Sequence, residues 1–195
     1  RLKDIAAVAG VSVMTVSKAL RDKPDLSVGT KLRIQALAQQ MGYVPDASAS
    51  GLRNRKTRLL GLVIPAPTDP VYSRVLLALE GLAYERGFDL LLAHSLGQVD
   101  REDSVIRRFM SRRVDGVFIA PVYRMESTAP IFEDLLKQGI PTVLLGQRAP
   151  FCQQFVNVET DDLSASEAVT RHLISLGHRR IAFFAGPTHS PWAQE

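Results

Sequence analysis

The stretch that decides the fold of the N-terminal region is DIAAVAGVSVMTVS, which runs from Asp4 to Ser17. Apolar residues in its first part recur on one face of a helix that we expect over residues 3–9. Gly10 then permits a tight turn, because glycine adopts left-handed backbone conformations without steric cost. Ser12 can cap a second helix over residues 13–20 by accepting a backbone N–H. A glycine turn between a short helix and a capped second helix predicts a helix-turn-helix.

The second helix has one face for packing and one for contact. The residues expected to pack inward are Val16, Ala19 and Leu20. The residues expected to face outward are Val13, Met14, Ser17 and Lys18. An exposed face at the start of such a helix fits the major groove of DNA, where side chains can read base edges. A helical hairpin packed on the rest of the chain would have the same pattern.

A third helix is expected between a cap at Ser27 and the breakers Gly42 and Pro45. The apolar residues that it offers for packing are Leu32, Ile34, Leu37, Ala38 and Met41. Packed against the first two helices, it would complete a small all-α domain over residues 1–45.

Charge is distributed unevenly along the 195 residues, although the whole chain carries a net charge of only +4. Residues 1–58 hold 11 Lys and Arg against 4 Asp and Glu, a net charge of +7, and the remainder carries −3. Clustered basic residues favour a polyanionic partner, because neutralised phosphates release counterions. A solvated basic face without a partner would have the same composition.

Residues 46–58 differ from both neighbouring regions, because they are first small and polar and then basic. So few apolar side chains cannot build a core, and Gly51 lowers the helix propensity further. We therefore expect a linker between two domains, in which a helix forms only on binding.

From Leu59 onward, short apolar runs alternate with amphipathic stretches. The expected strands are residues 59–64, 88–93, 117–120, 142–145 and 181–185. The expected helices are residues 72–86, 100–113, 127–138 and 162–176. This alternation predicts an α/β domain with a doubly wound parallel sheet. Ligands of such a sheet bind beyond the carboxyl ends of the strands, here in loops 65–70, 94–97, 121–124, 146–150 and 186–192.

Several classes of protein are disfavoured. The single cysteine, Cys152, cannot form an internal disulfide framework or a cysteine-rich zinc site. No apolar run approaches the roughly 20 residues of a spanning helix, and residues 1–10 lack the apolar block of a signal peptide, so we expect a soluble cytoplasmic protein with no membrane partner. No phosphate-binding, dinucleotide-binding or nucleophile-elbow motif is present, and the four histidines lack metal-ligand spacing. We therefore expect no catalytic residues, no cofactor and no metal.

Six segments of the chain together resemble a known protein family. They are Leu2–Ala6, Thr15–Leu20, Gly42–Asp46, Arg113–Val117, Gly139–Val143 and His172–Ala182. In these segments the chain closely resembles the lactose-repressor (LacI/GalR) family of bacterial transcription regulators. The resemblance implies a DNA-binding head over residues 1–45, a hinge helix over 46–58 and a periplasmic-binding-protein-like effector domain over 59–195. It also implies that the chain is truncated within the second lobe of that domain.

The resemblance assigns DNA contacts by position. Val13, Met14 and Lys18 fall where the family reads operator bases. Apolar Val13 and Met14 suit thymine methyl groups, whereas Lys18 can reach guanine acceptors. The residues that fall near phosphates are Ser12, Thr15 and Ser17.

In the hinge helix, the resemblance assigns DNA contact to Ser48, Ala49, Leu52 and Arg53. Leu52 matches a minor-groove leucine that acts as an apolar wedge between two base steps. Considered without the resemblance, an isolated leucine in a polar linker is more often a docking residue.

Four residues fall where the family binds its effector: Tyr72, Gly146, Ser190 and Trp192. The ring of Tyr72 could stack on a sugar or base, and a packing role explains it equally well, as it does for Trp192. Gly146 departs from the family, because many relatives place an aspartate there to hold effector hydroxyls. Gln147 or Arg148 could substitute for it, and Arg148 would suit an anionic ligand. The pair Asp161-Asp162 is explained by helix capping.

We therefore expect a sequence-specific transcription regulator, a repressor, that binds a roughly palindromic operator in double-stranded DNA as a homodimer. A small-molecule effector, a sugar or a related metabolite, would move the lobes and so order or disorder the hinge helices. One rival interpretation is an enzyme on a doubly wound sheet. The other is a pure small-molecule binding module, which the basic head disfavours.

Overall fold

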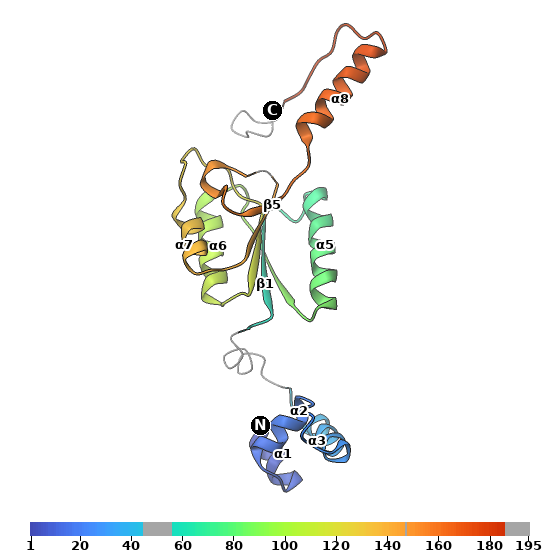
Figure 1. The fold of residues 1–195 in the computed structure, drawn as a ribbon, viewed down its shortest axis with the longest axis vertical. Coiled ribbons are helices and arrows are strands. Elements are labelled where there is room, and N and C mark those ends of the chain that lie inside the picture. Colours follow the sequence, from blue (N-terminus) through green and yellow to red (C-terminus); the bar gives the residue numbers. More distant parts are fainter. Residues whose placement is uncertain (45–55, 147, 186–195) are drawn as a thin grey trace. The chain divides into compact units, whose positions relative to one another are not determined.

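The computed structural model describes residues 1–44, 56–146 and 148–185 (Figure 1). The chain divides into two compact units, residues 1–50 and 51–195, and each is described by itself. Some residues singled out by the sequence lie outside the described residues: Ser48, Ala49, Leu52, Arg53, Gln147, Ser190 and Trp192. Their roles stay predictions.

In the described part of unit 1, residues 1–44, three helices pack on a small apolar core. They are α1 (Leu2–Ala9), α2 (Val13–Leu20) and α3 (Val28–Gln40). The side chains at the centre of the core, none of which is exposed, are Ile5, Val16, Ala19 and Ile34. Gly10 ends α1 with a φ of 65°, as the predicted tight turn requires.

The predicted serine caps are confirmed. The hydroxyl of Ser12 accepts the backbone N–H of Thr15 at 3.1 Å, and that of Ser27 accepts the N–H of Thr30 at 3.3 Å. The expected packing of Leu32 is wrong, because its side chain is 61% exposed. Leu32 is two residues from the buried Ile34, which on an α-helix places it on the opposite side.

Unit 2 is built on a five-stranded parallel sheet with the order β2-β1-β3-β4-β5. The strands are β1 (Leu59–Ile64), β2 (Asp89–His94), β3 (Gly116–Ile119), β4 (Thr142–Leu145) and β5 (Val156–Val158). The helices are α5 (Pro70–Glu85), α6 (Val99–Ser111), α7 (Pro130–Lys137) and α8 (Asp162–Ser175), with a 3-10 turn η1 (Pro150–Cys152). Helix α5 lies on one face of the sheet, and α6 and α7 lie on the other (Figure 1). The predicted doubly wound fold is thereby confirmed.

The main core lies between the sheet and helices α6 and α7. Its fully buried members include Ile106 from α6, Ile119 from β3 and Phe132 from α7. Asp115 holds the two residues that directly precede β1. Its carboxylate accepts the backbone N–H groups of Thr57 at 3.0 Å and Arg58 at 2.9 Å.

Two expectations about the strands are wrong. Residues 181–185 form no strand, and the side chains of Phe183 and Phe184 are 82% and 93% exposed. No strand among the described residues pairs with this segment, and an unpaired strand leaves its backbone groups unsatisfied. The fifth strand is instead β5, whose three residues are too few to give a periodicity signal.

The described part of the chain holds no helix with the length and apolarity needed to cross a membrane.

Candidate DNA-binding surface and ligand cavity

The outward face of α2 is the candidate DNA-binding surface. Val13 is 39% exposed and Met14 62% exposed, whereas Val16 on the same helix is fully buried. The Ser12 cap places the exposed pair in the first turn, where free backbone N–H groups favour negative charge. This exposure is the one expected from the sequence, and base contact by these residues stays a prediction.

The polar residues predicted for this surface form hydrogen bonds and an ion pair within unit 1. The hydroxyl of Thr15 bonds that of Ser12 at 2.9 Å, and the carbonyl of Ser17 accepts the Nε–H of Arg21 at 3.0 Å. Lys18 forms an ion pair with Asp25. The hydrogen bond from Lys18 outweighs slight desolvation and lowers the pKa of Asp25, which therefore keeps its charge at neutral pH.

In unit 2, a cavity of about 350 Å³ lies at the carboxyl ends of β3, β4 and β5, against the first turns of α5. It brings together Tyr72 and Gly146, two residues that the sequence assigned to one effector site. The strand order reverses between β1 and β3, and ligands of open α/β sheets bind at such a reversal, beyond the carboxyl ends of the strands. The position is therefore one where a ligand site is expected.

Tyr72 is held at the cavity by the cap of α5. The carboxylate of Asp69 accepts the N–H groups of Val71 at 2.8 Å and Tyr72 at 3.4 Å. Burial, with a smaller contribution from the charge of Asp69, raises the pKa of the Tyr72 phenol. The hydroxyl therefore stays protonated at neutral pH and can donate a hydrogen bond as well as accept one.

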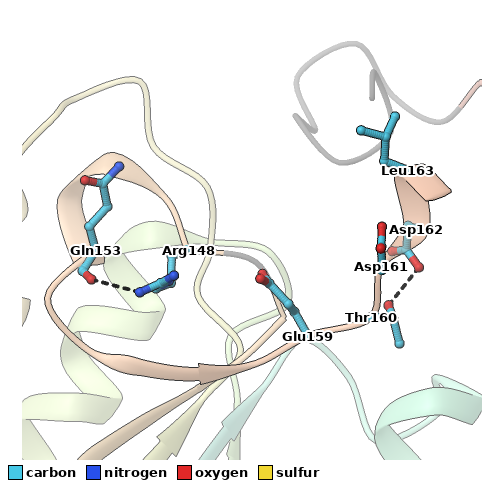
Figure 2. Close-up of a pocket in the computed structure, with 7 residues that line it drawn as sticks. All are labelled: Arg148, Gln153, Glu159, Thr160, Asp161, Asp162 and Leu163. Atoms are coloured by element: carbon cyan, nitrogen blue, oxygen red, sulfur yellow. Dashed lines mark hydrogen bonds between the residues drawn. The ribbon is translucent and has the colours of Figure 1, made fainter.

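A second, open pocket of about 710 Å³ adjoins this cavity and shares Glu159, Thr160 and Asp162 with it (Figure 2). Its remaining lining residues are Arg148, Gln153, Asp161 and Leu163. Figure 2 shows the carboxylate of Glu159 directed toward the side of the pocket that holds Arg148. The guanidinium of Arg148 donates to the carbonyl of Gln153 at 3.5 Å, so one of its edges is oriented by the backbone.

The two aspartates of this pocket have local partners. Asp161 caps α8 by accepting the N–H of Ser164 at 3.0 Å, which confirms the predicted capping, and this bond lowers the pKa of Asp161. Asp162 accepts the hydroxyl of Thr160 at 2.7 Å. The Asp161 carboxylate thus stays charged at neutral pH, and both side chains keep oxygen lone pairs for hydroxyl donors.

Sequence reasoning did not single out several lining residues: Val75, Pro121, Val158, Glu159 and Thr160. Pro121 belongs to loop 121–124, which the strand pattern did place at the ligand edge of the sheet. Glu159 and Thr160, which directly follow β5, were missed because β5 itself was missed. Within the described ranges, no group of three or more His, Cys, Asp or Glu side chains could hold a metal ion.

Comparison with known proteins identifies the family. Residues 1–46 match the family described as "Bacterial regulatory proteins, lacI family". Residues 57–195 match "Periplasmic binding proteins and sugar binding domain of LacI family". The two matches define the class as bacterial regulatory proteins that carry a domain related to periplasmic binding proteins. The chain belongs to the LacI family.

Individual relatives support this assignment. The ribose operon repressor of Escherichia coli strain K12 is 30% identical over 186 residues, 95% of this chain and 56% of that protein. The lac repressor dimer bound to operator and the anti-inducer ONPF has a similar fold, with a TM-score of 0.84 and 23% identity over 100% of this chain and 58% of that one. The complex of the transcriptional regulator CelR with cellobiose gives a TM-score of 0.59 and 27% identity over 100% and 57% of the two chains. The chain spans about half the length of the curated relatives it matches.

Proposed function

We propose that the protein is a sequence-specific DNA-binding regulator, a repressor, whose affinity for its operator is controlled by a small-molecule effector. The observation that carries the proposal is the two-faced α2, which buries Val16 and Ala19 completely and exposes Val13 and Met14 in its first turn. A capped second helix with an exposed N-terminal turn is the part of a helix-turn-helix that enters the major groove. The similarity to the ribose operon repressor and the lac repressor supports the same function.

In this function, the residues of α2 divide by chemistry. Val13 and Met14 contact thymine methyl groups, and Lys18 donates to guanine acceptors. The residues that hold phosphates are Ser12, Thr15 and Ser17. The hinge residues Ser48, Ala49, Leu52 and Arg53 contact the minor groove, with Leu52 as the apolar wedge.

The effector binds in the cavity of unit 2 and in the open pocket beside it. The ring of Tyr72 offers an apolar face, and the carboxylates of Glu159, Asp161 and Asp162 accept hydroxyl donors. Among the described lining residues, three carboxylates stand against the guanidinium of Arg148, and this excess of negative charge disfavours a strongly anionic ligand. A neutral polyhydroxylated ligand, a sugar, fits this lining best.

Gly146 provides no side chain at the position where, by the family resemblance, many relatives place an aspartate. Glu159 and Asp162 lie in the same lining and can accept the hydroxyls that such an aspartate would hold. We further propose that Ser190 and Trp192 complete the effector site, as the family resemblance implies.

The regulator acts as a homodimer, because pairing two heads on a palindrome adds their binding energies. Helix α5 supports a contact with a second copy, since its exposed side chains include Leu77 at 73%, Leu82 at 49% and Tyr84 at 79%. Leu92 in the edge strand β2 is also 42% exposed. A bacterial operator lies in the cytoplasm, so the regulator is proposed to act there.

The DNA-binding part is tested by selecting bound genomic fragments with the full-length protein and then measuring fluorescence anisotropy on the enriched sequence. Lys18→Ala and Met14→Ala are expected to weaken binding at least ~10-fold through lost base contacts. Lys137→Ala is the charge-matched control, because its partner is the neighbouring Glu133 of α7. Equal effects of Lys18→Ala and Lys137→Ala would show non-specific attraction and contradict the proposal.

The effector part is tested with sugar, nucleobase and phosphorylated-metabolite panels added to the protein–operator complex. A neutral sugar is expected to change operator affinity, and Glu159→Gln is expected to weaken that response, because it removes a charged acceptor. A response confined to phosphorylated compounds would contradict the neutral ligand and favour Arg148 as the main contact.

A further inference from the structure

A buried ionic cluster lies behind the ligand cavity, on residues that the proposed function does not use. Glu102 in α6 has no exposed surface. Its Oε1 atom accepts the backbone N–H of Val122 at 2.7 Å, and its Oε2 atom accepts from the guanidinium of Arg124 at 2.5 Å. One carboxylate of α6 therefore holds two points of the loop that follows β3.

Arg124 makes a second contact with α6 and connects the loop to two further elements, α7 and η1. The same Nη2 atom contacts Asp103 of α6 at 2.7 Å. The guanidinium carbon lies 5.5 Å from the ring centres of both Phe132 in α7 and Phe151 in η1. The Arg124 side chain is only 5% exposed, so these contacts replace water around the charge.

Stability alone is a weak explanation for this cluster. The desolvation of two buried charges offsets much of their mutual attraction. Well-packed apolar residues in their place often stabilise a fold equally well. Burial raises the pKa of Glu102, against the opposing effects of Val122 and Arg124. The Nε atom of Arg124 has no hydrogen-bond partner among the described residues. Desolvation of these groups thus offsets much of the stability that the cluster contributes. We therefore look for its role in the segments that it holds in place.

The segments that it holds are the ones that line the ligand sites. Pro121 lines the cavity with Tyr72 and directly precedes Val122. Phe151 follows three residues after Arg148, which lines the open pocket. Through Arg124, the cluster therefore ties the loops after β3 and β4 to α6.

We propose that Glu102 and Arg124 are positioning residues for effector binding, which fix the two loops in the shape that the ligand requires. The inference rests on the proposed function, because it assumes that the cavity binds the effector. Neither residue lines the cavity, so both act through the loops. Binding sites lose affinity when the residues that support them allow small displacements.

The test uses the full-length protein and the sugar identified by the panel above, with calorimetry for ligand affinity and thermal unfolding for integrity. Glu102→Gln keeps the shape but can accept from only one of its two donors. It is expected to weaken ligand binding at least ~10-fold while unfolding stays cooperative. The paired replacement Glu102→Leu with Arg124→Met removes both charges together, which avoids an unpaired buried charge, and is expected to give the same loss.

The control is Arg107→Met in the same helix. Arg107 is 59% exposed and contacts Asp103 at 3.8 Å and Asp134 at 4.0 Å. It shares Asp103 with Arg124, but its own contacts lie on α6 and α7 and include neither Glu102 nor a residue of a ligand-site loop. It is expected to leave ligand affinity unchanged. Hydrogen exchange at the Val122 amide should accelerate in Glu102→Gln and not in Arg107→Met, which separates loop release from general destabilisation.

The outcomes separate this inference from the function on which it rests. Wild-type ligand affinity in a cooperatively folded Glu102→Gln or double variant would overturn the positioning role and leave the proposed function intact. A wild-type protein that binds no compound of the panel would overturn both. A loss of ligand affinity equal to that of Arg107→Met would also overturn the positioning role.

Discussion

The ammonium group of Lys18 in α2 forms an ion pair with the carboxylate of Asp25, which lies in the segment between α2 and α3. Lys18 belongs to the proposed base-reading surface, so a guanine must draw the same ammonium group away from Asp25, although that group carries three N–H donors. The two side chains are 39% and 48% exposed, and ion pairs in water are weak, so the competition is mild.

We predict that Asp25→Asn increases operator affinity by about two- to five-fold, because it releases Lys18 for the DNA. The slope of log affinity against log salt should steepen as one more cation meets the DNA. Both quantities can be measured by fluorescence anisotropy over a range of salt concentrations.

The control for this prediction is Asp22→Asn. Asp22 pairs with Lys31 of α3 at 2.8 Å, and Lys31 is not among the proposed base-reading residues. The variant removes the same charge from the same segment. If both variants raise affinity equally, the gain comes from reduced repulsion of phosphates, and the competition at Lys18 is disproved.

The two serine caps of unit 1 allow stability and DNA contact to be separated. Ser12 and Ser27 each accept an N–H three residues ahead and bond a threonine hydroxyl, at 2.9 Å and 2.8 Å respectively. We predict that Ser12→Ala and Ser27→Ala each lower the free energy of unfolding by about 1 kcal/mol, measured by urea denaturation.

Only Ser12→Ala is expected to weaken operator binding beyond this shared destabilisation, because Ser12 lies at the proposed DNA-facing end of α2. The comparison is made at a temperature where both variants are fully folded. Equal operator affinities for the two variants would leave Ser12 as a helix cap without a phosphate contact.

Much of the head could be predicted from the sequence, because its signals are local. Gly10 and the capping serines specify turns and helix starts within a few residues of themselves. The contact between Lys18 and Asp25 could not be predicted, because it depends on how the chain turns after α2. An ion pair between a helix and the segment after it leaves no periodic trace in a sequence.

The ligand edge of unit 2 was less predictable. The strand pattern placed loop 121–124 at the correct edge, but it could not show that Arg124 is buried against the rings of Phe132 and Phe151. The apolar run at 181–185 looked like a strand, whereas pairing within the sheet selects β5 instead. Strand identity depends on a partner, which a single run of residues does not reveal.

Two apolar residues of α3, the buried Ile34 and the exposed Leu32, test which face of this helix packs on the core. We predict that Ile34→Ala lowers the free energy of unfolding by about 2–5 kcal/mol, because it creates a cavity where the native side chain has no exposed surface. Leu32→Ala should change it by less than about 1 kcal/mol, since Leu32 is 61% exposed. A large cost for Leu32→Ala would show that this side chain is buried against a partner in solution.

The close approach of β1 to α6 gives the last prediction. A Cβ atom built on Gly61 would lie 2.4 Å from Cδ2 of Phe109, a distance that real side chains do not adopt. We predict that Gly61→Ala lowers the free energy of unfolding by about 1–3 kcal/mol through overpacking. Phe109→Leu removes the ring carbons that clash, so the double variant should be more stable than the sum of the two single effects implies. Urea denaturation of the four proteins measures this coupling. Additive effects would mean that the sheet shifts to accept the methyl group, and that contact with Phe109 is not the reason for glycine at this position.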